Sequence, residues 1–368
     1  MFKLALVFGT RPEAIKMAPL VQECYRVPQW ETKVIVTGQH REMLDQVLDI
    51  FQITPNYDLN IMTHGQSLTD ITHRVLRGME QVFQKWKPDL VLVHGDTSTA
   101  FAAALASFYW QIPVGHVEAG LRTESIANPF PEEANRRLTD VLTSWYFAPT
   151  QQAANNLYAE GVNPERVFVT GNTVIDALLS VVEEDYEFTH PGLRALNFAR
   201  PLLVVTAHRR ENWGAPLKNI CAALLEISAK HSCEIVVSMH RNPALQQVMV
   251  DLLGHDPQIR LIEAPDYREF ANLLARSTLL LTDSGGLQEE APALHKPVLV
   301  LREVTERPEG VEAGTLKLVG HDQQEIVTEV TKLLEDVELY QKMSQAPNPY
   351  GDGRAAERIR EILEQKYK

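Results

Sequence analysis

Short apolar or β-branched runs alternate with longer helical stretches along the whole chain of 368 residues. Runs that are apolar almost throughout are typical of parallel strands covered by helices on both faces of a sheet. The predicted strands are 3–8, 33–37, 89–94, 113–117, 145–148 and 166–170 in the first half, and 202–206, 234–239, 259–262, 278–282, 297–301 and 315–319 in the second. Six strands in each half predict an α/β protein with two doubly wound, Rossmann-like domains.

A charged and helix-breaking stretch lies between the two halves. Residues 183–187 read EEDYE, and His190-Pro191-Gly192 cannot continue a helix. We therefore predict a first domain at 1–180 and a second at 195–350. A last helix is expected from Arg354 to about residue 365, with an apolar face formed by Ala356, Ile359 and Leu363.

Composition excludes several classes of partner. The chain carries 35 Lys+Arg against 48 Asp+Glu, a net charge of −13, which disfavours nucleic-acid and anionic-membrane surfaces. The longest uncharged run, residues 97–117, is long enough to span a bilayer, but it contains Pro113 and His116 and is interpreted as a buried helix followed by a buried strand. Three cysteines without a C-x-x-C pair indicate reduced thiols in a cytoplasmic protein.

Polar clusters follow the predicted strands repeatedly. They occupy residues 9–11, 39–41, 94–96, 118–120, 208–210, 239–242 and 283–286. Loops after strands are polar in most proteins, so no single cluster is informative. Ligands of open parallel sheets bind beyond the carboxyl ends of the strands, and clusters from both halves therefore predict one cleft between the two domains.

Two segments are suited to bind a nucleotide diphosphate. In residues 283–290, Ser284 can cap a helix, the following glycines admit an anion to its N-terminal amides, and Glu290 can accept hydrogen bonds from ribose. Arg11 and Lys16 begin the first crossover helix, where cations can meet phosphate. The alternative for residues 283–290 is an ordinary capped helix without a ligand, and the alternative for Lys16 is a solvent-exposed helix residue. The first turn is not G-x-G-x-x-G, and no spacing is typical of a metal site, so neither a nicotinamide or flavin cofactor nor a metal is expected.

Three acidic residues are candidates for acid–base chemistry. Asp96 and Glu118 follow consecutive predicted strands, where a carboxylate gains little unless it binds something. Glu132 and Glu133 follow Pro131 in a helical first turn, and the alternative role for one of them is only to pair with the arginines one turn later. His208 can neutralise or protonate a leaving group. The alternative is a loop histidine whose ring is hydrogen-bonded within the protein. His94 and His116 lie on apolar strands and are interpreted as core residues.

Seven blocks of sequence closely resemble the non-hydrolysing UDP-N-acetylglucosamine 2-epimerases. They are GTRPEAIKMAP at 9–19, VEAGLR at 117–122, PEEANR at 131–136, TAHRREN at 206–212, DSGGLQEE at 283–290, TERPE at 305–309 and NPYGDG at 348–353. The blocks cover nearly the whole chain in the family's order. The resemblance implies a fold like that of the B-type glycosyltransferases, with a last helix at 353–368 that crosses back to the first domain. It also implies a cytoplasmic homodimer that binds UDP-N-acetylglucosamine and UDP, uses no cofactor and supplies surface polysaccharide synthesis.

By position, the resemblance implies a role for each candidate residue. The implied catalytic residues are Asp96, Glu118, Glu132 and His208, and the implied substrate-binding residues are Arg11, Lys16, Phe270, Ser284, Gly285, Gly286, Glu290 and Arg307. A second, allosteric UDP-N-acetylglucosamine pocket would use Gln39, His40, Arg41, Arg209 and His240.

The implied reaction interconverts UDP-N-acetylglucosamine and UDP-N-acetylmannosamine. Since no carbonyl acidifies the C2 hydrogen and no nicotinamide site is expected, the remaining route loses UDP across C1–C2 and adds it back. A hydrolysing epimerase would instead release UDP and free sugar. A B-type glycosyltransferase would need an acceptor, and a sugar-nucleotide-binding regulator would have no need of clustered carboxylates.

Overall fold

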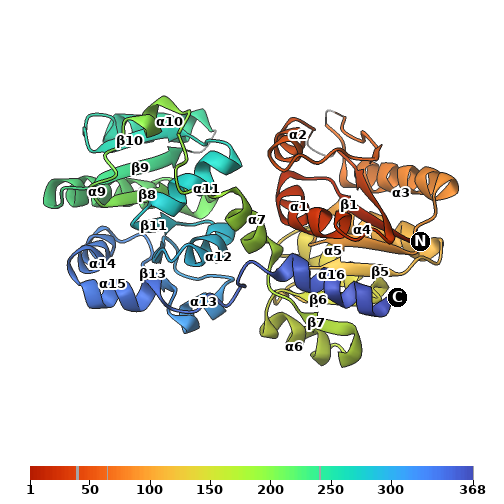
Figure 1. The fold of residues 1–368 in the computed structure, drawn as a ribbon. Coiled ribbons are helices and arrows are strands. Elements are labelled where there is room, and N and C mark those ends of the chain that lie inside the picture. Colours follow the sequence, from red (N-terminus) through yellow and green to blue (C-terminus); the bar gives the residue numbers. More distant parts are fainter. Residues whose placement is uncertain (39–40, 64, 240–241, 368) are drawn as a thin grey trace. The chain divides into compact units, whose positions relative to one another are not determined.

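The computed structural model describes residues 1–38, 41–63, 65–239 and 242–367 (Figure 1). It divides into two compact units. The first comprises Met1–Ser180 and Tyr350–Lys368, and the second comprises Val181–Pro349. The chain therefore leaves the first unit and returns to it at its C-terminal end.

The first unit contains a sheet of seven parallel strands in the order β3-β2-β1-β4-β5-β6-β7. Its strands are β1 (Phe2–Phe8), β2 (Trp30–Val36), β3 (Tyr57–Asp58), β4 (Leu90–His94), β5 (Val114–Val117), β6 (Trp145–Ala148) and β7 (Val167–Val169). Its helices are α1 (Arg11–Tyr25), α2 (Arg41–Ile50), α3 (Leu68–Lys85), α4 (Ser98–Tyr109), α5 (Glu132–Leu142), α6 (Gln151–Ala159), α7 (Thr173–Val181, which runs one residue into the second unit) and α16 (Ala355–Lys366), with the 3-10 turn η1 (Pro164–Arg166).

The second unit contains six parallel strands in the order β10-β9-β8-β11-β12-β13. Its strands are β8 (Leu202–Thr206), β9 (Glu234–Met239), β10 (Ile259–Glu263), β11 (Leu279–Thr282), β12 (Val298–Val300) and β13 (Leu316–Leu318). Its helices are α8 (Pro191–Arg194), α9 (Ala215–Lys230), α10 (Pro243–Leu253), α11 (Tyr267–Arg276), α12 (Gly285–Ala293), α13 (Pro308–Ala313), α14 (Gln323–Glu335) and α15 (Val337–Ser344), with the 3-10 turn η2 (Arg210–Asn212).

These strand orders confirm two doubly wound, Rossmann-like units. The sequence prediction of six strands in the first half was one too few, because it missed the edge strand β3. That strand has only two residues, Tyr57 and Asp58, and so offers no apolar run to recognise. Residues 97–117 form α4 and β5 as predicted, and no helix in the described part of the chain has the length and hydropathy needed to cross a membrane.

The inner strands of each sheet, such as β4 and β8, are buried on both faces, which explains their continuous apolar runs. Along β8, Leu203 and Val205 join the apolar cluster under α9 and α14, whereas Leu202 and Val204 join the cluster on the opposite face of the sheet. Alternate residues of a strand point to opposite faces, so a strand covered on both sides must be apolar throughout. Because both faces of these inner strands are covered, the loops at their ends are where polar side chains can be placed.

The last helix belongs to the first unit, as the resemblance implied. Ala356, Ile359 and Leu363 are buried on the side of α16, which packs against α1 (Figure 1). The carboxylate of Asp176 in α7 accepts hydrogen bonds from the backbone N–H groups of Ala355 and Ala356, at 3.2 and 2.8 Å. This distant carboxylate thus caps the N-terminus of α16, which has no capping side chain of its own among the described residues.

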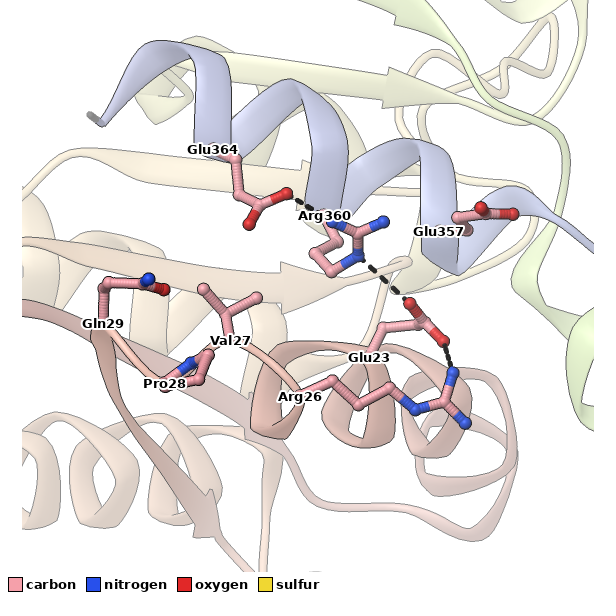
Figure 2. Close-up of a pocket in the computed structure, with 8 residues that line it drawn as sticks. All are labelled: Glu23, Arg26, Val27, Pro28, Gln29, Glu357, Arg360 and Glu364. Carbon is pink, nitrogen blue, oxygen red and sulfur yellow. Dashed lines mark hydrogen bonds and ion pairs between the residues drawn. The ribbon is translucent and has the colours of Figure 1, made fainter.

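Ion pairs line a hollow of about 630 Å³ between the end of α1 and α16 (Figure 2). Arg360 projects from α16 toward Glu23 of α1, 3.1 Å away, and also pairs with Glu364 (Figure 2). On the other side of Glu23 lies Arg26 (Figure 2). The charged side chains of this hollow are paired with one another, and the pair between Arg360 and Glu23 joins α16 to α1.

Candidate functional site

In the first unit, Glu118 is the centre of a cluster of polar groups. It lies directly after β5, and its carboxylate is 2.6 Å from Lys16 Nζ of α1, 3.2 Å from Asn172 Nδ2 and 3.1 Å from His94 Nε2. Its backbone φ is +66°, a left-handed conformation that a non-glycine residue rarely adopts. Strain of this kind is concentrated at functional sites, and here hydrogen bonds from Lys16 and Asn172 hold the Glu118 carboxylate in place.

His94 is buried, as its place on an apolar strand predicted, but its ring also contacts Glu118. Residues His94 and Val117 are paired across β4 and β5, which places the histidine beside the loop that carries Glu118. Burial lowers the pKa of His94 to about 3, although the charge of Glu118 acts in the opposite direction. His94 is therefore neutral at physiological pH. The sequence analysis missed this contact, and the only signal for it was the position of His94 two residues before Asp96.

His116 is a core histidine, as predicted. Its Nε2 donates to the carbonyl oxygen of Gly95 at 2.7 Å, and its Nδ1 lies 2.6 Å from Asp140. The His116 ring therefore holds the loop between His94 and Asp96 through the carbonyl oxygen of Gly95.

The four carboxylates around this cluster are in different environments. Asp96 is 2.5 Å from the guanidinium of Arg136, which the sequence analysis had considered only as a partner of the glutamates. Glu133 is fully buried and pairs with Arg136 and Arg137, so it is the structural member of the Glu132–Glu133 pair. Glu132 is half-buried at the start of α5 and makes no ion pair with any described residue. It is the carboxylate of this group that is left available to a ligand.

The turn before α1 holds Arg11 at the first position of that helix. Thr10 and Glu13 form a reciprocal cap, and the Glu13 carboxylate also accepts a hydrogen bond from Thr97 at 2.7 Å, which ties together the loops after β1 and β4. Burial raises the pKa of Glu13 despite these hydrogen bonds. Only glycine fits at position 9, because a Cβ there would lie 1.9 Å from Thr37 Oγ1. Tight packing of this turn thus fixes the position of Arg11 at the start of α1.

In the second unit, two guanidinium groups lie beside the N-terminus of α12. A Cβ on Gly285 would be 3.7 Å from Arg209 Nη2 and 3.8 Å from Arg307 Nη2. Ser284 is the N-cap residue as predicted, but its side chain makes no capping hydrogen bond within the described residues. Helix amides, a hydroxyl and two cations are the groups that bind phosphate. Glu290 is buried one turn into α12, near Gly286.

His208 follows β8 and contacts Asp283, which follows the neighbouring strand β11. His208 Nδ1 lies 3.1 Å from Asp283 Oδ1, and the imidazole is 42% exposed. Phe270 is a half-buried residue of α11 that packs on the apolar cluster of that face. Each unit thus gathers its own predicted residues at strand ends.

The residues predicted for a second pocket are only partly described. Gln39, His40 and His240 lie outside the described residues. Arg41 pairs with Asp45 at 2.9 Å and with Asp58. Arg209 lies 3.6 Å from Glu306 and, as described above, beside Gly285 with the predicted substrate residue Arg307.

Other features of the described residues lie apart from these clusters. The hollow in Figure 2 contains none of the predicted site residues. Within the described ranges, no group of three or more His, Cys, Asp or Glu side chains is arranged to hold a metal ion. The three cysteines, Cys24, Cys221 and Cys233, are free and buried.

A family model and several known proteins match this chain over most of its length. The family model described as UDP-N-acetylglucosamine 2-epimerase matches residues 22–364. The UDP-N-acetylglucosamine 2-epimerase of Salmonella typhimurium is 53% identical over 370 residues, which cover 98% of each chain. The crystal structure of the Neisseria meningitidis UDP-GlcNAc 2-epimerase bound to UDP-GlcNAc is 49% identical, with a TM-score of 0.89 over 99% of this chain and 100% of that one.

A more distant structure is similar over the same length. The Methanocaldococcus jannaschii UDP-GlcNAc 2-epimerase in complex with UDP-GlcNAc and UDP is 37% identical, with a TM-score of 0.80 over 99% of this chain and 100% of that one. The fold class expected from the resemblance is confirmed by these structures. On this evidence, the chain belongs to the UDP-N-acetylglucosamine 2-epimerase family.

Proposed function

We propose that this protein is a non-hydrolysing epimerase that interconverts UDP-N-acetylglucosamine and UDP-N-acetylmannosamine. The observation that carries the proposal is the set of carboxylates in the first unit, which differ in charge partner. Lys16 lies against Glu118 and Arg136 lies against Asp96, so each of these two carboxylates has a cation as its partner. Glu132 has no cation beside it among the described residues.

The reaction needs at least two acid/base groups, because a proton must leave one face of C2 and return to the other. In the first step a carboxylate accepts the C2 proton, the C1–O bond to UDP breaks, and a C1=C2 double bond forms. In the second step a UDP oxygen bonds to C1 again, and C2 takes a proton on its opposite face. Protons and electrons balance without an external oxidant, and we assign the proton transfers to Glu118, Glu132 and Asp96.

Retention of UDP decides whether the intermediate returns to a sugar nucleotide. We assign the diphosphate to the N-terminus of α12, with Ser284, Gly285, Gly286 and Arg307, and the ribose to Glu290. Arg11 and Lys16 add positive charge, Phe270 offers an aromatic ring for the base, and His208 stabilises the departing phosphate. A diphosphate held by several donors at once dissociates slowly, which favours re-addition over release.

We further propose a cytoplasmic homodimer that supplies surface polysaccharide synthesis. Buried free thiols support a reducing compartment. The contacting helices α4 and α5 expose Phe108, Tyr109, Leu138 and Val141, at 46–80% of each residue's surface, which supports pairing of two copies through this face. A second UDP-N-acetylglucosamine pocket that uses Gln39, His40, Arg41, Arg209 and His240 remains part of this proposal.

One experiment separates the candidate activities. The purified protein is incubated with UDP-N-acetylglucosamine in deuterated water, without acceptor or nicotinamide, and the C2 proton and free UDP are followed by NMR. We expect UDP-N-acetylmannosamine that carries deuterium at C2, with little free UDP. Stoichiometric free UDP and free sugar would indicate a hydrolysing epimerase. A product without deuterium at C2 would refute the elimination mechanism, and an unlabelled, unchanged substrate would indicate a glycosyltransferase or a binding protein.

Variants then test the carboxylates. Glu118→Gln and Glu132→Gln should retain UDP binding and lose on the order of 10²–10⁴-fold in kcat, the usual contribution of a general acid or base. The exposed Glu165 of η1 provides the matched control, and Glu165→Gln should keep the wild-type rate. Near-normal rates in both site variants, with the fold intact, would remove these residues from the mechanism.

A further inference from the structure

Asp283 is a fully buried carboxylate that no step above has used. It follows β11, and the pairing of Thr282 with Thr206 places it beside the loop that follows β8. Its Oδ2 accepts three hydrogen bonds of 2.8 Å each, from the backbone N–H groups of His208 and Arg209 and from Asn212 Nδ2. One oxygen of Asp283 therefore holds the whole turn that begins at His208.

The other oxygen faces the ring of His208. Asp283 Oδ1 lies at an ion-pair distance of 3.1 Å from His208 Nδ1 and accepts no hydrogen bond from a described group. An ionised carboxylate only accepts hydrogen bonds, so an Nδ1 that carries hydrogen matches this oxygen. A neutral His208 would then have its lone pair on Nε2, and a protonated one would carry N–H groups on both nitrogens.

We propose that Asp283 is a positioning residue that keeps hydrogen on Nδ1 of His208, so that Nε2 is the nitrogen that exchanges a proton with the leaving diphosphate. This inference rests on the proposed function. As the C1–O bond breaks, Nε2–H of the imidazolium gives its proton to the freed phosphate oxygen, and the ring becomes neutral with hydrogen on Nδ1. As UDP adds back, the phosphate oxygen returns that proton to Nε2. Asp283 keeps its charge in both directions.

The test is Asp283→Asn, which preserves size and shape. Three N–H donors surround the Oδ2 position, so the amide oxygen of the variant belongs there and its NH₂ group must face His208 Nδ1. A donor in that place forces Nδ1 to accept and moves the hydrogen of the neutral ring to Nε2. The backbone of the turn keeps its acceptor, so the variant should fold.

The first readout is the tautomer of His208, and it needs no substrate. Long-range ¹H–¹⁵N correlation spectra of histidine-labelled protein are recorded as the pH is raised until the ring signals stop changing, and they then distinguish Nδ1–H from Nε2–H in the neutral ring. His208→Ala identifies the signals by their loss. We expect Nδ1–H in the wild type and Nε2–H in Asp283→Asn. The same tautomer in both proteins would overturn the proposal.

The second readout is epimerisation. Asp283→Asn should lower kcat by on the order of 10²-fold or more, with KM and the Kd for UDP within a few-fold of wild type. In a His208→Ala background the same substitution should cost less than about 3-fold, since its effect acts through the ring. An undiminished loss in that background, or an unchanged kcat in the single variant, would also overturn the proposal.

A matched control is available in the first unit. Asp176 is a buried carboxylate that likewise accepts backbone hydrogen bonds, but no histidine faces it among its described contacts. Asp176→Asn should change neither the His208 tautomer nor kcat. If the wild-type protein does not epimerise UDP-N-acetylglucosamine at all, the proposed function fails, while the tautomer measurement still decides whether Asp283 controls the His208 ring.

Discussion

The buried neutral histidine of the first unit predicts a specific loss of stability in acid. In the folded protein the pKa of His94 is about 3, because burial disfavours the imidazolium. In the unfolded chain the ordinary value of about 6.5 applies. Below pH 6.5 the unfolded state therefore binds a proton that the folded state does not bind until about pH 3. Stability from this group is fully present above pH 6.5 and falls as the pH is lowered.

The size of the effect follows from the two pKa values. Between pH 8 and pH 5, protonation of His94 in the unfolded chain should lower the free energy of unfolding by about 2 kcal/mol. His94→Gln removes the titration and keeps a polar side chain beside Glu118. The quantity compared is the change in the free energy of unfolding between the two pH values, so a different starting stability of the variant does not affect the result.

Urea unfolding at pH 8, 7, 6 and 5 measures this change. Four of the five tryptophans lie in the first unit, and a Trp213→Phe background makes their fluorescence report that unit alone. His73, exposed on α3, supplies the control, and His73→Gln should keep the wild-type pH dependence. The reasoning is refuted if His94→Gln loses as much stability as the wild type over this range, within about 0.5 kcal/mol.

Two further substitutions test what holds the first unit together. Gly120→Ala should lower the free energy of unfolding by more than about 2 kcal/mol, because φ is +84° and the new Cβ would lie 2.2 Å from Ala153 O. Gly161→Ala, at φ +82° with open space around it, should cost only about 1 kcal/mol, and equal losses in urea unfolding would contradict the clash. Arg360→Ala should cost about 1–2 kcal/mol, whereas Arg354→Ala, whose side chain is 64% exposed, should cause no measurable loss of stability. Thermal or urea unfolding measures both losses. Equal losses of stability in the two arginine variants would show that the ion pairs of Arg360 in Figure 2 add nothing to stability.

Local pattern was enough to predict the architecture. Continuous apolar runs indicated strands buried on both faces, and alternate residues such as Leu203 and Val204 do enter opposite clusters. The motifs likewise fell at strand ends, where Glu118 and His208 are found. The one strand that was missed, β3, has two residues and lacks the periodicity on which such a prediction depends.

The partners of each site residue were decided only by the tertiary structure. Lys16 and Glu118 are 102 positions apart, Asp96 and Arg136 are 40 apart, and the Asp283 carboxylate meets the His208 backbone across 75. Sequence periodicity reports which face of an element is buried, but not which loops the strand order brings together. Sheet registers such as Thr206 with Thr282 set those neighbours, because parallel pairing places the carboxyl ends of adjacent strands side by side. The residue types that could do chemistry were therefore readable from the sequence, whereas the charges that tune them depend on strand order and packing.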